Sequence, residues 1–184
     1  LDGLSDTFDA IASRGDRGKK LSIMKDSTVG PIGVIAIVMA LLLKYVLLNA
    51  VFFQSTSVAY LMTVISMPVL SRWAMVTAAF YSRPARNDGL GRLFIEHTGA
   101  RQLISATVAA IVIMALVCTM VSQFSLLMFY IMFAMPVLFA FSFAAVWFFK
   151  KSFGGMTGDS FGVVNEIAVL IFLLSAVINN AKLT

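Results

Sequence analysis

The hydrophobic positions of this chain form long continuous runs instead of alternating with polar ones. Runs such as "IGVIAIVMALLL" and "LISATVAAIVIMAL" lack the alternation of membrane strands. A helix needs roughly 20 apolar residues to cross a bilayer, and it satisfies its own backbone hydrogen bonds there. The sequence therefore predicts an all-α, polytopic transmembrane bundle. Its five spans are expected near residues 31–48, 57–81, 102–121, 124–149 and 159–178.

The residues before the first run have a different pattern. Asp2, Asp6 and Asp9 are spaced i, i+4, i+7, so on a helix they share one face. Apolar side chains occupy much of the remaining surface, which predicts a short N-terminal amphipathic helix. We expect one integral membrane domain over residues 1–184, in which residues 1–30 form a motif-bearing segment outside the spans.

Composition agrees with membrane insertion. Of the 184 residues, 60% are hydrophobic and 12% are charged, about half the charged share of a soluble domain. The first residue is Leu instead of Met, and no signal-peptide pattern precedes the aspartates. The sequence is therefore expected to begin inside a longer protein.

The basic residues occupy alternate connections between the expected spans. The connections "NAVFFQST" and "SQF" carry no charge, whereas residues 1–30, 82–101 and 150–158 carry most of the lysines and arginines. By the positive-inside rule these three segments face the cytoplasm, in a bacterial or archaeal plasma membrane. The net charge of +5 then reflects topology, and no nucleic acid is expected as a partner.

The carboxylates follow the same division. All except Glu166 fall on the side assigned to the cytoplasm, with Asp159 at the cytoplasmic boundary of the fifth span, and Glu166 lies about two turns into that span. Membrane insertion does not require this arrangement, since acidic residues contribute little to orientation. The pattern favours a site at the cytoplasmic face over a pore through the bilayer.

A row of carboxylates on one helix face repels itself unless a cation neutralises it. Oxygen ligands suit Mg²⁺ or Mn²⁺, and the absence of a Cys/His cluster argues against zinc. The spacing of Asp2, Asp6 and Asp9 leaves a second interpretation open, a solvated acidic face near a chain end.

Two further features lie at the expected membrane boundary. Lys25 and Asp26 adjoin the turn before the first span, where they could stand at the mouth of the same site or merely anchor the helix start. Arg72 lies in the cytoplasmic half of the second span, and a guanidinium there suits a phosphate group. The alternatives for Arg72 are snorkelling or an ion pair with Glu166. Lys44 is expected to snorkel outward.

Two connections are rich in glycine. In "RPARNDGLGRLFIEHTGAR" the arginines, Arg92 among them, could clamp phosphates, although an ordinary topogenic loop explains the segment equally well. In "FGGMTGDSFGVVNE" three glycines, Thr157 and Asp159 stand at an expected helix start, where backbone N–H groups can bind an anion. Asp159 and Glu166 are seven residues apart and share a helix face.

Five segments follow one another along the chain: "DGLSDTFDA", "IMKDSTVGPIGV", "SRWAM", "GLGRLF" and "GGMTGDSFGVVNE". Together, and in this order, they resemble the cobalamin synthase family, adenosylcobinamide-GDP ribazoletransferases of the late cobalamin pathway. The resemblance implies that a ribose hydroxyl of α-ribazole, or of its 5′-phosphate, attacks the cobinamide-side phosphorus of adenosylcobinamide-GDP and that GMP leaves.

The patterns and the resemblance together define an expected site. Asp2, Asp6, Asp9 and Asp159 are expected to hold Mg²⁺ or Mn²⁺, and Asp9 or Asp26 is expected to act as the base. The remaining expected contacts, to phosphate or substrate, are Lys25, Arg72, Arg92, Thr157, Gly158 and Glu166.

Other classes stay open at this stage. A phospholipid-type alcohol phosphotransferase also spaces aspartates along a helix, but it usually has an Ala-Arg pair where Ser5 and Asp6 stand here. A cation transporter could line its path with Arg72 and Glu166. The sequence leaves open whether the protein forms a homo-oligomer.

Overall fold

The computed structural model describes residues 1–26, 28–120, 122 and 124–181, and every regular element in this part of the chain is helical. The only β-type pairing within it is an isolated parallel bridge between Pro84 and Met156. The elements are α1 (Asp2–Ala12), α2 (Arg17–Ile23), α3 (Pro31–Gln54), α4 (Ser57–Tyr81), α5 (Leu90–Glu96), α6 (Ala100–Met120), α7 (Phe124–Phe129), the π-helix η1 (Tyr130–Ala134), α8 (Met135–Phe153) and α9 (Gly158–Ala181).

Five helical segments are long and apolar enough to cross a membrane, which confirms the predicted all-α architecture. They are α3, α4, α6, α9 and the continuous segment Phe124–Phe153. The predicted bounds of α4 agree with the structure at both ends. Val121, the last residue expected in the third span, lies outside the described residues.

One predicted connection is wrong in part. The segment "NAVFFQST" was expected to lie outside the first span, yet α3 continues through Gln54. Nothing in the segment breaks a helix, and the Asn49 amide donates to the carbonyl of Tyr45 one turn earlier (2.8 Å). The helix ends only where Thr56 caps α4 by accepting a hydrogen bond from the backbone N–H of Ala59 (3.2 Å).

The fourth span contains one turn of π-helix. Pro136 follows that turn within the first residues of α8, and proline has no N–H to donate to the preceding turn. The π turn therefore adjusts the backbone where the regular hydrogen-bond ladder is interrupted. Gly154, with φ of 86°, ends α8 in a left-handed conformation that favours glycine.

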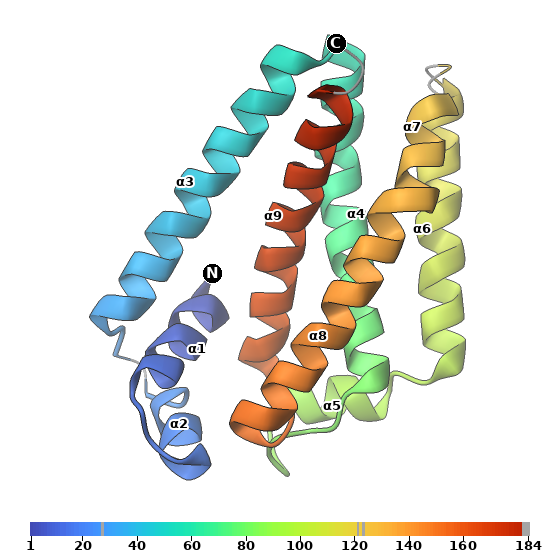
Figure 1. Ribbon diagram of the computed structural model, residues 1–184. Coiled ribbons are helices and arrows are strands. Elements are labelled where there is room, and N and C mark those ends of the chain that lie inside the picture. Colours follow the sequence, from blue (N-terminus) through green and yellow to red (C-terminus); the bar gives the residue numbers. More distant parts are fainter. Residues whose placement is uncertain (27, 121, 123, 182–184) are drawn as a thin grey trace.

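Helix α9 stands at the centre of the bundle, beside α3, α4 and α8 (Figure 1). Over half of its most apolar stretch (56%) is buried within the protein, against 17% for α3 and for α6. The apolar faces of α3 and α6 therefore point outward, as expected of helices in contact with lipid.

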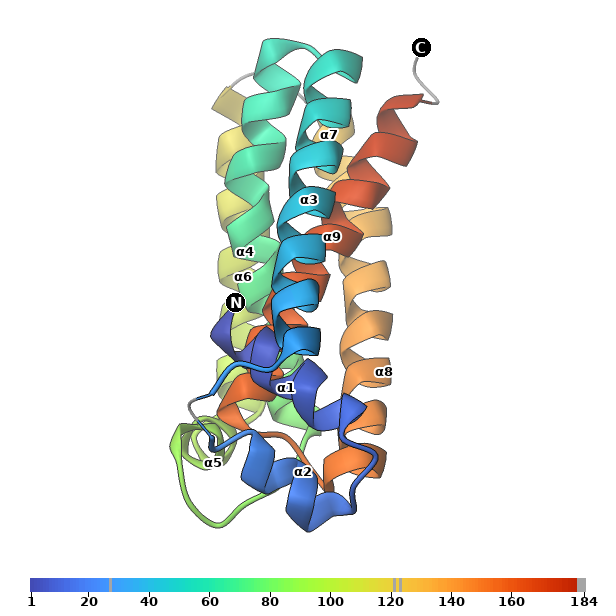
Figure 2. The ribbon, with the colours of Figure 1, turned by 90° about the vertical axis from the view of Figure 1, so that its left-hand side faces the viewer.

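The short helices gather at one end of the bundle. Figures 1 and 2 show α1, α2 and α5 at the end where α3 and α9 begin and where α4 and α8 finish. Helix α1 lies against both α3 and α9. The segments that carry the acidic and glycine-rich motifs thus meet at one end of the molecule.

Candidate functional site

Helices α1 and α9 cross at glycines. A Cβ atom added to Gly3 would lie 2.6 Å from the Cα of Asp159, and one added to Gly162 would lie 3.7 Å from the Cα of Gly3. At position 3 only glycine allows this approach of the two backbones. As a result, the aspartates of α1 and Asp159 at the start of α9 share one region.

Asp6 is the carboxylate most affected by this crossing. Burial and, in decreasing order, the charges of Asp2, Asp159 and Asp9 together raise the pKa of Asp6 from 3.8 to about 6. Among the described residues, none of these four carboxylates belongs to an ion pair. The crossing therefore gathers negative charge without a cation to balance it.

The donor set suits a hard divalent cation that is shared with a substrate. Within the described part of the chain, no three Asp, Glu, His or Cys side chains lie close enough to form a complete metal cage. Mg²⁺ commonly takes one or two carboxylates and completes its shell with waters and substrate phosphates. The carboxylates around Asp6 fit that kind of site.

Asp9 has a structural role at the start of α3. Its two carboxylate oxygens accept hydrogen bonds from the backbone N–H groups of Gly30 and Gly33, both at 2.8 Å. Asp9 thus caps α3 from a neighbouring helix, where Gly30 itself has no side chain to do so. Each oxygen retains another lone pair, so the expected metal and base roles of Asp9 stay predictions.

The start of α9 is held by its own side chains and by the loop before α5. The hydroxyls of Thr157 and Ser160 each accept the other residue's backbone N–H, both at 3.2 Å. A Cβ atom on Gly91 would lie 2.5 Å from the nitrogen of Gly158, so α5 begins directly against α9. The bridge between Pro84 and Met156 fixes the same two loops.

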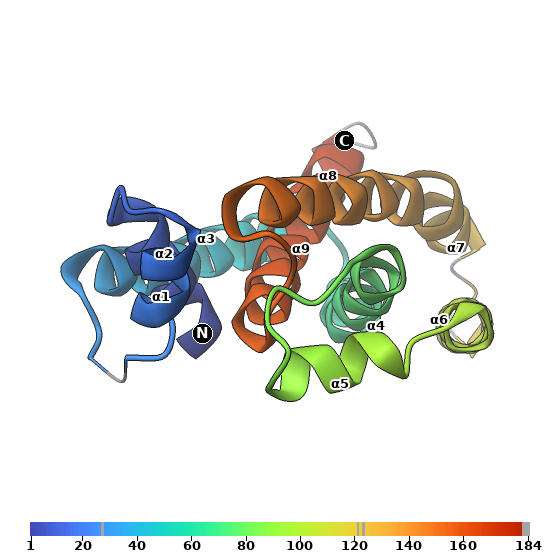
Figure 3. The same cartoon turned by 90° about the horizontal axis from the view of Figure 1, so that it is seen from below.

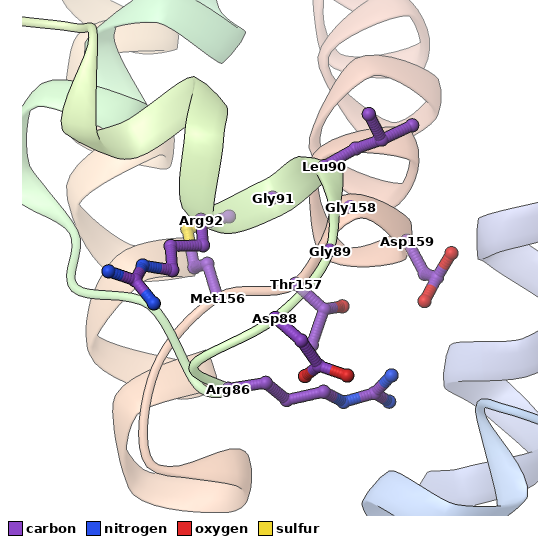
Figure 4. A pocket seen from close by; sticks show the side chains of 10 residues that line it. All are labelled: Arg86, Asp88, Gly89, Leu90, Gly91, Arg92, Met156, Thr157, Gly158 and Asp159. Carbon is purple, nitrogen blue, oxygen red and sulfur yellow. The ribbon is translucent and has the colours of Figure 1, made fainter.

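These loops enclose a polar pocket of about 210 Å³ beside Asp159 (Figure 4). Arg86 extends toward the same side as the Asp159 carboxylate, whereas Arg92 points the opposite way. Arg92 is bound to Glu96 at 2.7 Å and to the carbonyl of Asn87. Arg86 donates to the carbonyl of Leu21 at 2.8 Å, and its Nε is buried without a hydrogen-bond partner. The guanidinium of Arg86 therefore lines the pocket with one N–H group that makes no hydrogen bond within the described part of the protein.

The segment "IMKDSTVGPIGV" adjoins this pocket through its residue Lys25, which forms an ion pair with Asp88 at 3.0 Å. The hydrogen bond and charge of Lys25 lower the pKa of Asp88, a pocket residue. Asp26 stays exposed and accepts the backbone N–H of Thr28 at 3.0 Å, and hydrogen bonds from Thr28 lower the pKa of Asp26. The expected role of Asp26 as a base stays a prediction.

A row of connected polar side chains crosses the bundle at membrane depth. Lys44 of α3 forms an ion pair with Glu166 of α9, so the expectation that Lys44 snorkels outward is wrong. Arg72 does not pair with Glu166: it donates to the amide oxygen of Asn165 and contacts Met75. Asn165 in turn donates to Glu166 at 3.3 Å. A buried carboxylate between helices is a stronger partner for Lys44 than distant solvent.

Sequence reasoning left three residues out of the expected site: Arg86, which it counted only among the arginines of its loop, Lys44, which it assigned to the outer surface, and Asn165. One signal was present, because Arg92 and Glu96 are four residues apart and such pairs bind each other on a helix. That spacing could have directed attention from Arg92 to Arg86. The partners of Lys44 and Asn165 depend on how α3, α4 and α9 meet, which no local pattern reveals.

The glycine crossing gives a direct stability prediction. Gly3→Ala should lower the free energy of unfolding by about 1–3 kcal/mol, because the new methyl group meets backbone atoms of Asp159 that cannot move aside cheaply. Thermal unfolding in detergent measures the effect. The control is Gly18→Ala, where the new Cβ would meet nothing closer than an Asp16 oxygen at 3.6 Å. A Gly3→Ala protein as stable as Gly18→Ala would refute the close crossing.

Comparisons with known proteins place the chain among relatives of one kind. A sequence profile described as Cobalamin-5-phosphate synthase matches residues 1–177. The adenosylcobinamide-GDP ribazoletransferase of Geotalea daltonii is 37% identical over 96% of this chain and 66% of its own length. The enzymes so named from Fusobacterium nucleatum and Thermodesulfovibrio yellowstonii are 34% and 33% identical, over 94% and 95% of this chain and 66% of their own lengths.

The chain spans about two thirds of the length of these relatives. No solved structure matches it. Because the profile covers nearly the whole sequence and includes both the acidic helix α1 and the start of α9, the chain belongs to the cobalamin-5-phosphate synthase family.

Proposed function

We propose that this protein is a membrane-embedded transferase that joins adenosylcobinamide-GDP to α-ribazole or α-ribazole 5′-phosphate and releases GMP. The observation that carries the proposal is the crossing of α1 and α9 at Gly3, which collects unpaired carboxylates beside a polar pocket. The names of the relatives supply the substrate class.

The reaction exchanges one phosphorus–oxygen bond for another. A ribose hydroxyl of the ribazole attacks the cobinamide-side phosphorus of the diphosphate, its proton passes to a base, and the bond to the GMP oxygen breaks. Such transfers depend mainly on positioning the groups and on neutralising phosphate charge. The base is proposed to be Asp9 or Asp26, as the sequence predicts.

In this proposal Asp6, with Asp2, Asp9 or Asp159, holds a Mg²⁺ ion that neutralises charge on the diphosphate when it is bound. Gly158 and its neighbours at the start of α9 offer backbone N–H groups to a phosphate oxygen. The hydroxyl of Thr157 is hydrogen-bonded to the hydroxyl of Ser160, which stabilises the start of α9. Lys25 fixes the pocket loop through Asp88.

Arg72 and Glu166 lie deeper, on the row of connected polar side chains that runs from α4 through α9 to α3. Arg72 is exposed at membrane depth and pairs with a neutral amide, so its charge is available to a substrate anion. We propose that the site faces the cytoplasm, the side indicated by the basic connections. The plasma membrane is the proposed location.

The test is product formation by the full-length protein in liposomes. With adenosylcobinamide-GDP, α-ribazole and Mg²⁺, the expected result is equal release of GMP and cobalamin product, both lost when the metal is chelated. Transfer from a CDP-alcohol instead would indicate a phospholipid-type phosphotransferase. Ion flux with no group transfer would indicate a transporter, and either result would refute the proposal.

Arg86 should contribute more to substrate binding than Arg92. Arg86→Gln is expected to raise the KM for adenosylcobinamide-GDP about 10–100-fold, the usual effect of losing a charged hydrogen bond. Arg92→Gln should change KM less, because Arg92 points away from Asp159 and is bound to Glu96. Steady-state kinetics on both variants measures the two KM values. A larger increase for Arg92→Gln than for Arg86→Gln would favour Arg92 as the phosphate contact, as the sequence predicts.

A further inference from the structure

A second, apolar cleft of about 460 Å³ lies between α1, α8 and α9. Its walls include Phe8, Phe141, Phe148, Val164 and Ile167. Phe141 and Phe148 both belong to the fourth span, and Phe148 lies in its last two turns, so the cleft extends from near the expected membrane surface into the span. Phe148 remains 40% exposed, and the cleft is therefore accessible from the side.

Thr7 is the one polar residue among the described residues that line this otherwise apolar cleft. It has no exposed surface (0%), and its hydroxyl has no hydrogen-bond partner. A threonine in a helix usually bonds a carbonyl of the preceding turn, and a buried hydroxyl without a partner costs stability. An occupant with a hydrogen-bond acceptor would satisfy Thr7.

Positive charge stands at the membrane-surface end of the cleft. We call Arg14, Arg17 and Lys151 the basic cluster; all three side chains are exposed, and no ion pair among the described residues involves any of them. Arg17 donates to the carbonyl of Lys151 at 3.3 Å, which joins α2 to the end of α8 (Figure 3). Asp16 is the carboxylate beside the cluster, and it caps α2.

The sequence places this cluster next to the cleft. Arg14 follows the cleft residue Ile11 by three positions, and Lys151 follows Phe148 by three. Lys151 also lies over the ring of Trp147, 5.4 Å from its centroid, an arrangement typical of the membrane interface. An apolar cleft that ends in unpaired positive charge matches an acyl chain joined to an anionic headgroup.

We propose that this cleft binds an anionic phospholipid. One acyl chain lies between α1, α8 and α9, an ester carbonyl accepts the Thr7 hydroxyl, and the phosphate contacts the basic cluster. Basic pockets at the membrane surface recognise lipid headgroups in this way. The site lies on the α8 side of α1, and its occupant does not depend on the proposed transfer reaction.

Native mass spectrometry of the full-length protein tests this inference. The protein is reconstituted in equal amounts of phosphatidylglycerol and phosphatidylcholine with identical chains, then released in mild detergent. The wild type should retain phosphatidylglycerol preferentially. Each basic residue removed should reduce retention about fivefold, so Arg17→Gln with Lys151→Gln should lose nearly all of it. Ala145→Phe, which fills the cleft, should abolish retention.

Matched controls lie on α6, away from the cleft. Arg101→Gln removes an exposed charge and Val108→Phe enlarges an exposed apolar side chain, and both should retain lipid as the wild type does. The charge variants alter exposed residues only, so they remain informative if Ala145→Phe fails to fold. Equal retention of the two lipids, unchanged retention in the double charge variant, or no retained lipid, as when a protein segment fills the cleft, would overturn the proposal.

Discussion

Asp6→Asn should reduce turnover about 10²–10³-fold or more while the protein still inserts into the membrane. Asp6 is the carboxylate around which Asp2, Asp9 and Asp159 gather, so neutralising it removes the strongest attraction for a cation. Turnover with saturating substrates and Mg²⁺ in liposomes measures the loss. Asp16→Asn, at the exposed start of α2, is the matched control and should retain activity.

The same variant should be more stable than the wild type when divalent cations are absent. The pKa of Asp6 is about 6 in the folded protein against 3.8 ordinarily, so the folded state binds its proton more readily than the unfolded state. The protonated form therefore stabilises the fold at low pH, and that contribution is lost as the pH rises through about 6. Between pH 5 and pH 7.5 the thermal midpoint of the wild type should fall relative to that of Asp6→Asn.

Added Mg²⁺ should make the wild type more stable than Asp6→Asn at pH 7.5, because the ion binds and stabilises only the protein in which the Asp6 carboxylate is ionised. A gain in stability combined with a loss of activity is typical of a residue retained for function at the expense of the fold. An Asp6→Asn protein that turns over normally, or one that is less stable than the wild type in chelator, would contradict the role given to Asp6.

The second large effect concerns Lys44 and Glu166. Lys44→Met or Glu166→Gln alone should lower the free energy of unfolding by about 3–5 kcal/mol, because each leaves one charge without its partner in a mostly buried place. Their side chains are only 22% and 11% exposed. The double variant should recover most of the loss. Chemical denaturation in detergent measures all three proteins.

The exposed pair Lys25 and Asp88 provides the comparison, since its side chains are 56% and 68% exposed. Breaking that pair should change stability by less than about 1 kcal/mol. If Lys44→Met proves as mild as Lys25→Met, the membrane-depth ion pair does not form.

Much of the fold follows from the sequence for physical reasons. Continuous apolar runs require helices in lipid, and Ser57–Tyr81 was predicted with both ends correct. The i, i+4, i+7 spacing of Asp2, Asp6 and Asp9 and the apolar residues between them predicted a short N-terminal helix, which the structure shows as Asp2–Ala12. Pro31 was correctly placed at the start of a helix.

The contacts between elements could not be predicted in the same way. Periodicity records which face of a helix is buried, but not which neighbour covers it, so the contact of Gly3 with Asp159 was not foreseen. For the same reason Lys44 was assigned to solvent although Glu166 lies within reach. The spacing of Arg92 and Glu96 indicates along the chain that Arg92 has a partner, but the side toward which Arg86 extends depends on the arrangement of α5 and α9.

The central claim is that the aspartates at the crossing of α1 and α9 hold a divalent cation together with the substrate diphosphate. Anomalous diffraction from Mn²⁺ in crystals of the full-length protein with adenosylcobinamide-GDP locates the ion directly. The account predicts a peak bound by Asp6 and at least one of Asp2, Asp9 and Asp159, in contact with the diphosphate. A peak bound elsewhere, with these carboxylates free of metal, would contradict it.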